Sequence, residues 1–158
     1  MAGRREALTA FAGDTERVRV AVEEFLRFES STNSATGSRH AKRSSAASSL
    51  PADARITLCI GAANRDPAQF FDPDRLDLAR DPNRHIAFGS GIHTCAGMNL
   101  ARLEGRVALS RFLARFPGYR LHGDPVRGGR ARFRGFPAFA GARRVDPPEG
   151  AKLPRRLW

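Results

Sequence analysis

The sequence predicts a mainly α-helical chain with a small amount of β structure, an α+β fold. Apolar residues recur every three or four positions over 14–29 and again over 98–116, as they do in amphipathic helices. Between these segments, residues 55–63 alternate and then become apolar, which is typical of a strand. Closely spaced prolines and glycines exclude a long helix from most of the remaining chain.

Length and charge narrow the class of protein. The chain has 158 residues, the length of one ordinary domain, and a formal charge of +11. No apolar run approaches the ~20 residues that span a bilayer, and the first residues lack the pattern of a secretory signal. We therefore expect a cytoplasmic protein without a membrane partner. The basic excess attracts anions of many kinds, but no recognition motif accompanies it, so no nucleic-acid partner is expected.

Composition divides the chain into four segments. They are a helical segment (1–29), a loop rich in Ser and Ala (30–50), a segment with strand, meander, glycine-rich loop, long helix and short terminal strands (51–139), and a loose tail (140–158). Residues 30–49 contain eight serines and no acidic residue, so we expect a disordered loop there. The short strands are expected at 119–121 and 132–139.

The helix over 14–29 has a clear start and a clear apolar face. Asp14 or Thr15 can serve as its N-cap, and Val18, Val22 and Phe25 share the face expected to enter the core. A shorter helix is expected before it, over 4–11.

Two cysteines, with no CxxC pair, exclude a disulfide framework and a structural zinc site. Cys59 lies within the predicted strand and is expected in the core.

The second cysteine, Cys95, has a more unusual neighbourhood. Three glycines surround it, Gly89, Gly91 and Gly97, which allow tight turns and close approach of the backbone to a flat ligand. Cys95 also precedes the long helix, whose positive N-terminal end favours a thiolate. His93 can donate to an anionic group near the loop. A zinc or protease pair of His93 and Cys95 lacks the further ligand or acid that either site needs.

The segment from Phe88 to Gly97 resembles the haem-binding signature of the cytochrome P450 family, F-G-x-G-x-[HR]-x-C-x-G, with every specified position occupied. Three other segments follow the family's order. They are similar to its ExxR helix (Glu24 to Arg27), its bacterial strand and turn (Gly61 to Pro67) and its meander (Phe71 to Leu78). The resemblance implies the C-terminal, haem-proximal part of a cytochrome P450 fold. That fold is incomplete here, because family members are more than twice as long.

The resemblance also implies a cofactor, haem b (iron protoporphyrin IX), with Cys95 as the thiolate ligand of its iron. His93 would contact a haem propionate, and Phe88 would pack beside the ligand. His85 is a further candidate for a propionate, and Arg39 is the nearest candidate for the family's propionate-binding arginine.

The ExxR resemblance implies that Glu24 and Arg27 join Arg75 in a charge-paired triad that braces the loop. Taken without the other motifs, Glu24 and Arg27 would be an ordinary pair on a helix surface.

The implied activity is that of a monooxygenase, which inserts one oxygen atom from O2 into a small organic substrate. Its electrons would come from NAD(P)H through a reductase and a ferredoxin, and Arg102 and Arg106 would meet the acidic ferredoxin. No catalytic residue is assigned, because the family's distal acid–alcohol pair is absent. Ala12 to Thr15 resembles that pair only superficially. The alternative is a truncated, catalytically inactive remnant, or a haem-binding module without oxygenase activity.

Overall fold

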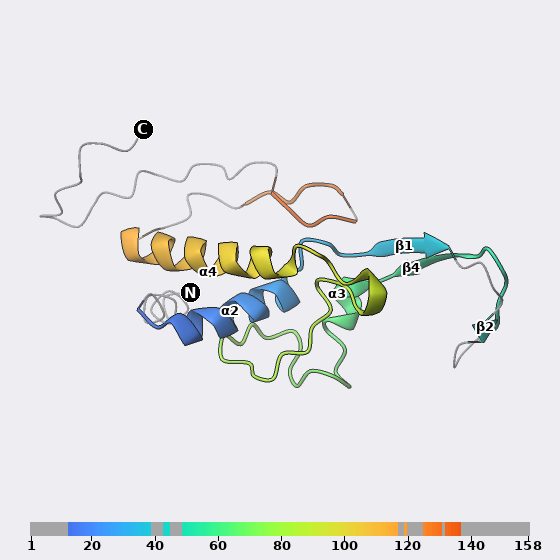
Figure 1. The fold of residues 1–158 in the computed structure, drawn as a ribbon, viewed down its shortest axis with the longest axis horizontal. Coiled ribbons are helices and arrows are strands. Elements are labelled where there is room, and N and C mark those ends of the chain that lie inside the picture. The colour runs from blue at the N-terminus through green and yellow to red at the C-terminus, as the bar shows by residue number, and fades with distance from the viewer. Residues whose placement is uncertain are drawn as a thin grey trace, which may run out of the picture.

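The computed structural model describes residues 13–38, 43–44, 49–116, 119, 125–130 and 132–136. Two helices, α2 and α4, lie side by side, and a narrow hairpin of β1 and β4 extends away from them (Figure 1). The expected helix over 4–11 and the tail over 140–158 lie outside the described residues. Within the described part of the chain, no helix has the length and apolar character needed to cross a membrane.

Helix α2 (Thr15–Phe28) confirms the first predicted helix. Asp14 is its N-cap, and the Asp14 carboxylate accepts hydrogen bonds from the amides of Glu16 and Arg17 at 3.1 and 3.0 Å. The predicted apolar face is largely buried: Val18 and Val22 enter the core together with Ala21. Phe25 remains half-buried.

In the segment that follows, the described residues (30–38, 43–44 and 49–50) include strands where the composition predicts a structureless loop. Strand β1 (Ala35–Ser38) pairs antiparallel with β4 (Arg55–Leu58), with Ala35 opposite Leu58. Nearer the tip, β2 (Arg43–Ser44) pairs with β3 (Ser49–Leu50). Serine and alanine carry no strong strand signal, so the pairing with β4 decides the conformation here.

The predicted strand over 55–63 is shorter than expected. It ends at Leu58, and the short helix α3 (Ile60–Ala63) follows, with Ile60 buried. Cys59 lies at the junction and is exposed, so its prediction as a core residue is wrong. The hairpin has no second layer against either face in the described residues, which leaves little core for Cys59 to enter.

Helix α4 (Met98–Arg115) confirms the second predicted helix, but several of the apolar residues that gave it its periodicity are exposed. Only Leu113 is fully buried, whereas Leu100, Leu103 and Val107 are 59%, 52% and 44% exposed. The side that approaches α2 carries small residues. A Cβ at Gly105 would lie 3.2 Å from Val22, so this glycine lets the two helices come close.

The remaining described segments run beside the end of α2. Residues 64–88, which include the meander predicted over 71–78, contain neither helix nor strand. Residues 66–82 are called the meander below. Of the two predicted terminal strands, only Tyr119 of the first is described, and it is in neither helix nor strand. Of the second, residues 132–136 are described, and there Phe133 forms an antiparallel bridge with Thr32.

Candidate functional site

Glu24 is the centre of a buried network between α2 and the meander, with no exposed surface. Its carboxylate accepts hydrogen bonds from Arg27 at 2.8 Å, the Asp77 amide at 2.9 Å, Asn83 Nδ2 at 3.0 Å and Arg80 Nε at 3.2 Å. Burial raises the pKa of Glu24, but the bonds from Arg27 and Asp77 outweigh burial, so the net pKa is lowered from 4.5. Glu24 is therefore held ionised inside the protein.

Arg27 balances this charge and joins α2 to two other segments. Its guanidinium meets Glu24 as a fork, with both nitrogens at 2.8 Å from carboxylate oxygens. Nη1 also donates to the backbone carbonyls of Asn64 and Pro73, each at 2.8 Å. A buried ion pair requires this completeness, because an unpaired buried charge is strongly destabilising.

The second arginine side chain at Glu24 is Arg80, which corrects the expected position of Arg75. The Arg80 side chain is 10% exposed, and its Nε lies 3.2 Å from Glu24 Oε2. Arg75 is exposed and contributes its backbone carbonyl, which accepts a hydrogen bond from Arg27 Nη2 at 3.2 Å. The main chain of Arg75 therefore faces α2. In its side-chain contacts the triad is Glu24, Arg27 and Arg80.

Asn64 connects this buried network to the cysteine loop. The residue has no exposed surface, and its Oδ1 accepts a hydrogen bond from the Ile86 amide at 2.8 Å. The Ile86 carbonyl in turn accepts one from Gly89 at 2.9 Å. Because Arg27 donates to the Asn64 carbonyl, hydrogen bonds run from the ExxR helix through the turn after α3 to the start of the loop.

The loop over 88–97, here called the Cys95 loop, folds back on itself. The Cys95 amide donates to the Phe88 carbonyl at 2.9 Å, which closes the loop at its base. Inside it, the Thr94 amide and hydroxyl both donate to the Gly91 carbonyl, at 3.1 and 2.8 Å. These bonds place the cysteine opposite the phenylalanine that begins the signature.

Two of the loop's three glycines are required by backbone conformation. Gly89 and Gly91 have φ of +76° and +68°, where other residues are strained. Gly97 has an ordinary φ of −85°, but a Cβ there would lie 3.9 Å from Cys95 Sγ. Gly97 therefore leaves open space beside the sulfur.

Cys95 is an exposed free thiol that lies just before α4. Its carbonyl accepts a hydrogen bond from the amide of Met98, the first residue of that helix, at 3.2 Å. His93 ends the short 3-10 helix η1 (Gly91–His93) and is also exposed. The structure thus presents both side chains to an external partner, and their roles toward haem stay predictions.

Glu23, the neighbour of Glu24, organises a second cluster. Its carboxylate accepts hydrogen bonds from Arg102 at 2.8 and 3.0 Å and pairs with His85 Nε2 at 2.9 Å. Burial raises the pKa of Glu23, but the bonds from His85 and Arg102 prevail and lower it to about 2. The His85 side chain is 2% exposed, so its assignment to a propionate is corrected: Glu23 already holds it.

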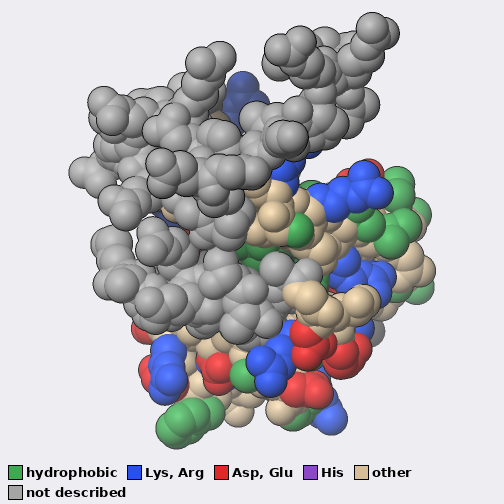
Figure 2. Space-filling model, turned by 90° about the vertical axis from the view of Figure 1, so that its left-hand side faces the viewer, with side chains coloured by type: hydrophobic (Ala, Val, Ile, Leu, Met, Phe, Trp, Pro, Cys, Tyr) green, Lys and Arg blue, Asp and Glu red, His purple; other side chains and the backbone are tan. Residues whose placement is uncertain are grey.

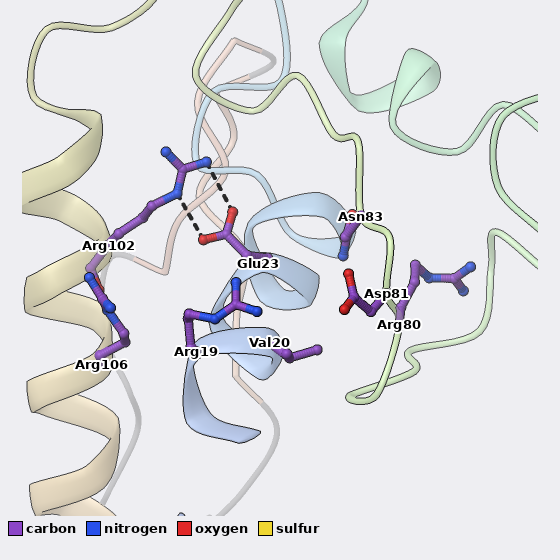
Figure 3. A pocket seen from close by; sticks show the side chains of 8 residues that line it. All are labelled: Arg19, Val20, Glu23, Arg80, Asp81, Asn83, Arg102 and Arg106. Carbon is purple, nitrogen blue, oxygen red and sulfur yellow. Dashed lines mark hydrogen bonds and ion pairs between the residues drawn. The ribbon is translucent and has the colours of Figure 1, made fainter. Parts of the chain in front are cut away.

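A cavity of about 390 Å³ lies beside this cluster, between α2, α4 and the meander. Figure 3 shows Arg102 reaching from α4 to Glu23 on α2, with Arg19 and Arg106 close by. Arg106 Nε donates to the Arg102 carbonyl at 3.2 Å. Among the charged groups that line the cavity, Glu23 and Arg102 pair with each other. Arg19 and Arg80 pair with Glu16 and Glu24, which lie outside the lining.

Cys95 offers a single sulfur ligand, which fits a metal whose other ligands come from a bound cofactor. No group of three or more His, Cys, Asp or Glu side chains suited to a metal ion occurs among the described residues. A soft thiolate suits iron, and the iron of a porphyrin already carries four nitrogen ligands. The exposed sulfur, the two glycine turns and the open space at Gly97 fit a flat group lying against the loop.

Sequence reasoning missed four residues of this site: Glu23, Asn64, Arg80 and Asn83. Glu23 and Arg102 carry opposite charges on the two predicted helices, a signal that could have suggested their pairing. Asn64 and Asn83 lie in irregular segments, where no periodicity reports burial.

The sequence model of the family described as cytochrome P450 matches residues 17–125. The chain is 40% identical over 125 residues to cytochrome P450 107B1 of Saccharopolyspora erythraea, covering 78% of this chain and 31% of that protein. It is 43% identical over 101 residues to 6-deoxyerythronolide B hydroxylase of the same organism, covering 64% and 25%. The chain therefore spans between a quarter and a third of the length of these relatives.

Solved structures agree with the sequence matches. P450BioI, in complex with an acyl carrier protein that carries hexadec-9Z-enoic acid, superposes with a TM-score of 0.80 and 34% identity. That match covers 84% of this chain and 35% of P450BioI. The tirandamycin C-bound monooxygenase TamI gives a TM-score of 0.77 and 37% identity, over 82% of this chain and 33% of TamI. The chain that carries the braced Cys95 loop therefore belongs to the cytochrome P450 family.

Proposed function

We propose that this chain forms the haem-thiolate part of a cytochrome P450 monooxygenase, with Cys95 as the iron ligand of haem b. The observation that carries the proposal is the exposed thiol of Cys95 on a loop whose base is closed at Phe88 and braced from α2. When bound there, the haem supplies the activation of O2 from which one oxygen atom enters a small organic substrate.

The chain's own residues bind and orient that group. We assign to Cys95 the bond to iron, to His93 a hydrogen bond to a propionate, and to Phe88 packing beside the sulfur. The glycine turns at Gly89 and Gly91 support this, because they let the backbone lie close to a flat ligand. The buried network at Glu24 supports it further by restricting the loop through Asn64.

The electron donor in this proposal is a ferredoxin, reduced by its NAD(P)H-dependent reductase. The net charge of +11 favours an acidic partner. On the face shown in Figure 2, basic and acidic side chains of the described residues lie next to each other. Arg102 is already paired with the Glu23 carboxylate, whereas Arg106 donates to a backbone carbonyl. Arg106 is therefore the better candidate of the two for contact with the donor.

A second candidate is a haem-binding module without oxygenase activity. The chain spans about a third of its relatives, and the apolar residues Leu100, Leu103 and Val107 of α4 are exposed. Both observations favour a role of the described residues in holding haem rather than in forming a complete substrate site. In that case haem binding at Cys95 would remain and oxygenation would not.

The reduced carbon-monoxide absorption spectrum of the haem-loaded chain tests the proposal. We expect the band of thiolate ligation in the parent chain, its loss in Cys95→Ser and its retention in Cys59→Ser, which removes the other exposed cysteine. A band that survives in Cys95→Ser contradicts the assignment. Substrate oxidation with ferredoxin and reductase, measured against free haem, then separates the monooxygenase from the module.

A further inference from the structure

We propose that Glu23 is a positioning residue for the thiolate ligand. It holds His85 and Arg102 against Phe88, and through the Phe88 backbone it sets the place of Cys95. The identity of the group that Cys95 binds rests on the proposed function, whereas the contacts of Glu23 are seen in the structure of this chain.

The Glu23 carboxylate is shared by two partners from different elements. Oε1 accepts a hydrogen bond from Arg102 Nε at 2.8 Å, and Oε2 accepts one from Arg102 Nη2 at 3.0 Å. Oε2 also lies 2.9 Å from His85 Nε2. Figure 3 shows the two bonds that Arg102 makes across the space between α4 and α2. One side chain therefore joins α2, α4 and the segment that leads into the Cys95 loop.

The orientation of His85 is set on both sides of its ring. The Ala87 amide donates to Nδ1 at 3.2 Å, so this nitrogen is the acceptor and Nε2 carries the proton that is donated to Glu23. The ring is 2% exposed, which leaves it no solvent partner to exchange for the carboxylate. His85 is therefore held in one orientation, three residues before Phe88.

Both partners of Glu23 lie against Phe88. The Arg102 guanidinium carbon is 4.9 Å from the centre of the Phe88 ring, within the range of a cation–π contact. The His85 and Phe88 ring centres are 6.3 Å apart, with the planes tilted by 51°. The Phe88 carbonyl accepts the Cys95 amide at 2.9 Å. A shift of Phe88 would therefore reach the cysteine through a single hydrogen bond.

The charges around the cavity explain why a carboxylate is needed at this place. Arg19, Arg80, Arg102 and Arg106 all line it, and Glu23 and Asp81 are the acidic residues among the described lining. Without the Glu23 charge, Arg102 would face other guanidinium groups with no counter-ion of its own. We expect it to leave the Phe88 ring for solvent, which loosens the base of the Cys95 loop.

Hydrogen exchange of the Cys95 amide in the haem-free full chain tests this inference directly. Glu23→Gln should accelerate exchange at Cys95 by about tenfold, the effect of losing one charge-assisted hydrogen bond from the closed loop. The matched control is Glu16→Gln, which removes the carboxylate of another arginine pair on α2; Glu16 is 71% exposed, lies in the first turn of the helix and, within the described part of the chain, makes no hydrogen bond or ion pair with Phe88 or Cys95. Equal rates at Cys95 in the two variants, or acceleration spread evenly along α2, would overturn the proposal.

A second variant covers the case in which Glu23→Gln folds poorly. Arg102→Lys keeps the positive charge but loses the fork and the flat face over Phe88, and should accelerate Cys95 exchange by about threefold. In the haem-loaded protein, both variants should lower the fraction with thiolate ligation, while Glu16→Gln should not. If the unsubstituted parent chain shows no thiolate ligation, the proposed function is refuted. Unchanged Cys95 exchange in both variants would refute the role of Glu23.

Discussion

Glu23 and Glu24 are neighbours on one helix, yet they serve different parts of the molecule. Glu24 has no exposed surface and accepts bonds from the meander and from Arg27. Glu23 is 16% exposed and accepts bonds from α4 and from the segment before the Cys95 loop. A helix turns by about 100° per residue, so consecutive side chains meet different neighbours.

The difference teaches that the ligand loop is held from two directions. The Glu24 network restrains it from the interior, through Asn64 and Ile86, and is inseparable from the packing of the meander. The Glu23 cluster restrains it from the side of α4 and retains contact with solvent. We therefore expect a change at Glu24 to cost the fold most of its stability, and a change at Glu23 to act most strongly on the loop with a smaller loss of overall stability.

Glu24→Ala should have the largest effect. It leaves Arg27 buried without its counter-charge and should cost about 3–5 kcal/mol, a large share of the stability of a typical domain. Urea unfolding followed by circular dichroism measures the loss. Glu16→Ala is the control, because Glu16 and Arg19 form the same i,i+3 pair on the exposed side of α2, and little change is expected. Similar losses in both variants would contradict the account of Glu24.

The choice between Arg80 and Arg75 gives the next largest effect. Arg80→Ala removes a mostly buried donor from Glu24 and from the Phe71 carbonyl, and should cost about 1.5–3 kcal/mol. Arg75→Ala leaves the backbone carbonyl that Arg27 uses, so stability should stay close to that of the parent. The same unfolding measurement compares them. A larger loss for Arg75→Ala would restore Arg75 as the triad's third side chain.

Acid should weaken the fold partly through Glu23, whose pKa is lowered from 4.5 to about 2. A carboxyl with a lowered pKa contributes stability that is complete above its unfolded pKa and is lost as the pH falls through its folded pKa. Stability should therefore fall between pH 4.5 and about 2, with Glu23 contributing about 1–2 kcal/mol after allowance for its partial exposure. Glu24 acts in the same direction.

Urea midpoints measured across that pH range check this expectation. Glu23→Gln should be less stable than the parent at neutral pH and should lose less of its stability on acidification. The account of Glu23 fails if parent and variant lose stability in parallel over the whole range.

Local patterns predicted much of the fold. The cap at Asp14, the helix after it and the helix after Cys95 follow from periodicity and capping chemistry, which are set within a few residues. The serine-rich stretch did not reveal β1, because that strand depends on pairing with β4 some twenty residues later. For Cys59 the error was to predict burial, because a run of apolar residues does not show whether another part of the protein packs over the strand.

The site was predictable where a motif carries it and less so where packing does. The signature located Cys95 and the two glycines with positive φ. Arg75 and Arg80 lie in the same irregular meander, and no spacing rule shows which guanidinium turns toward Glu24. The pairing of His85 with Glu23 depends on how α2 approaches the loop, which is a tertiary property.

X-ray absorption at the iron of the haem-loaded chain is the most direct test of the central claim, that this braced loop presents Cys95 to the metal. We predict one sulfur scatterer at bonding distance in the parent chain and in Cys59→Ser, and none in Cys95→Ser. Sulfur scattering that persists without Cys95, or that is missing from the parent, would contradict the claim.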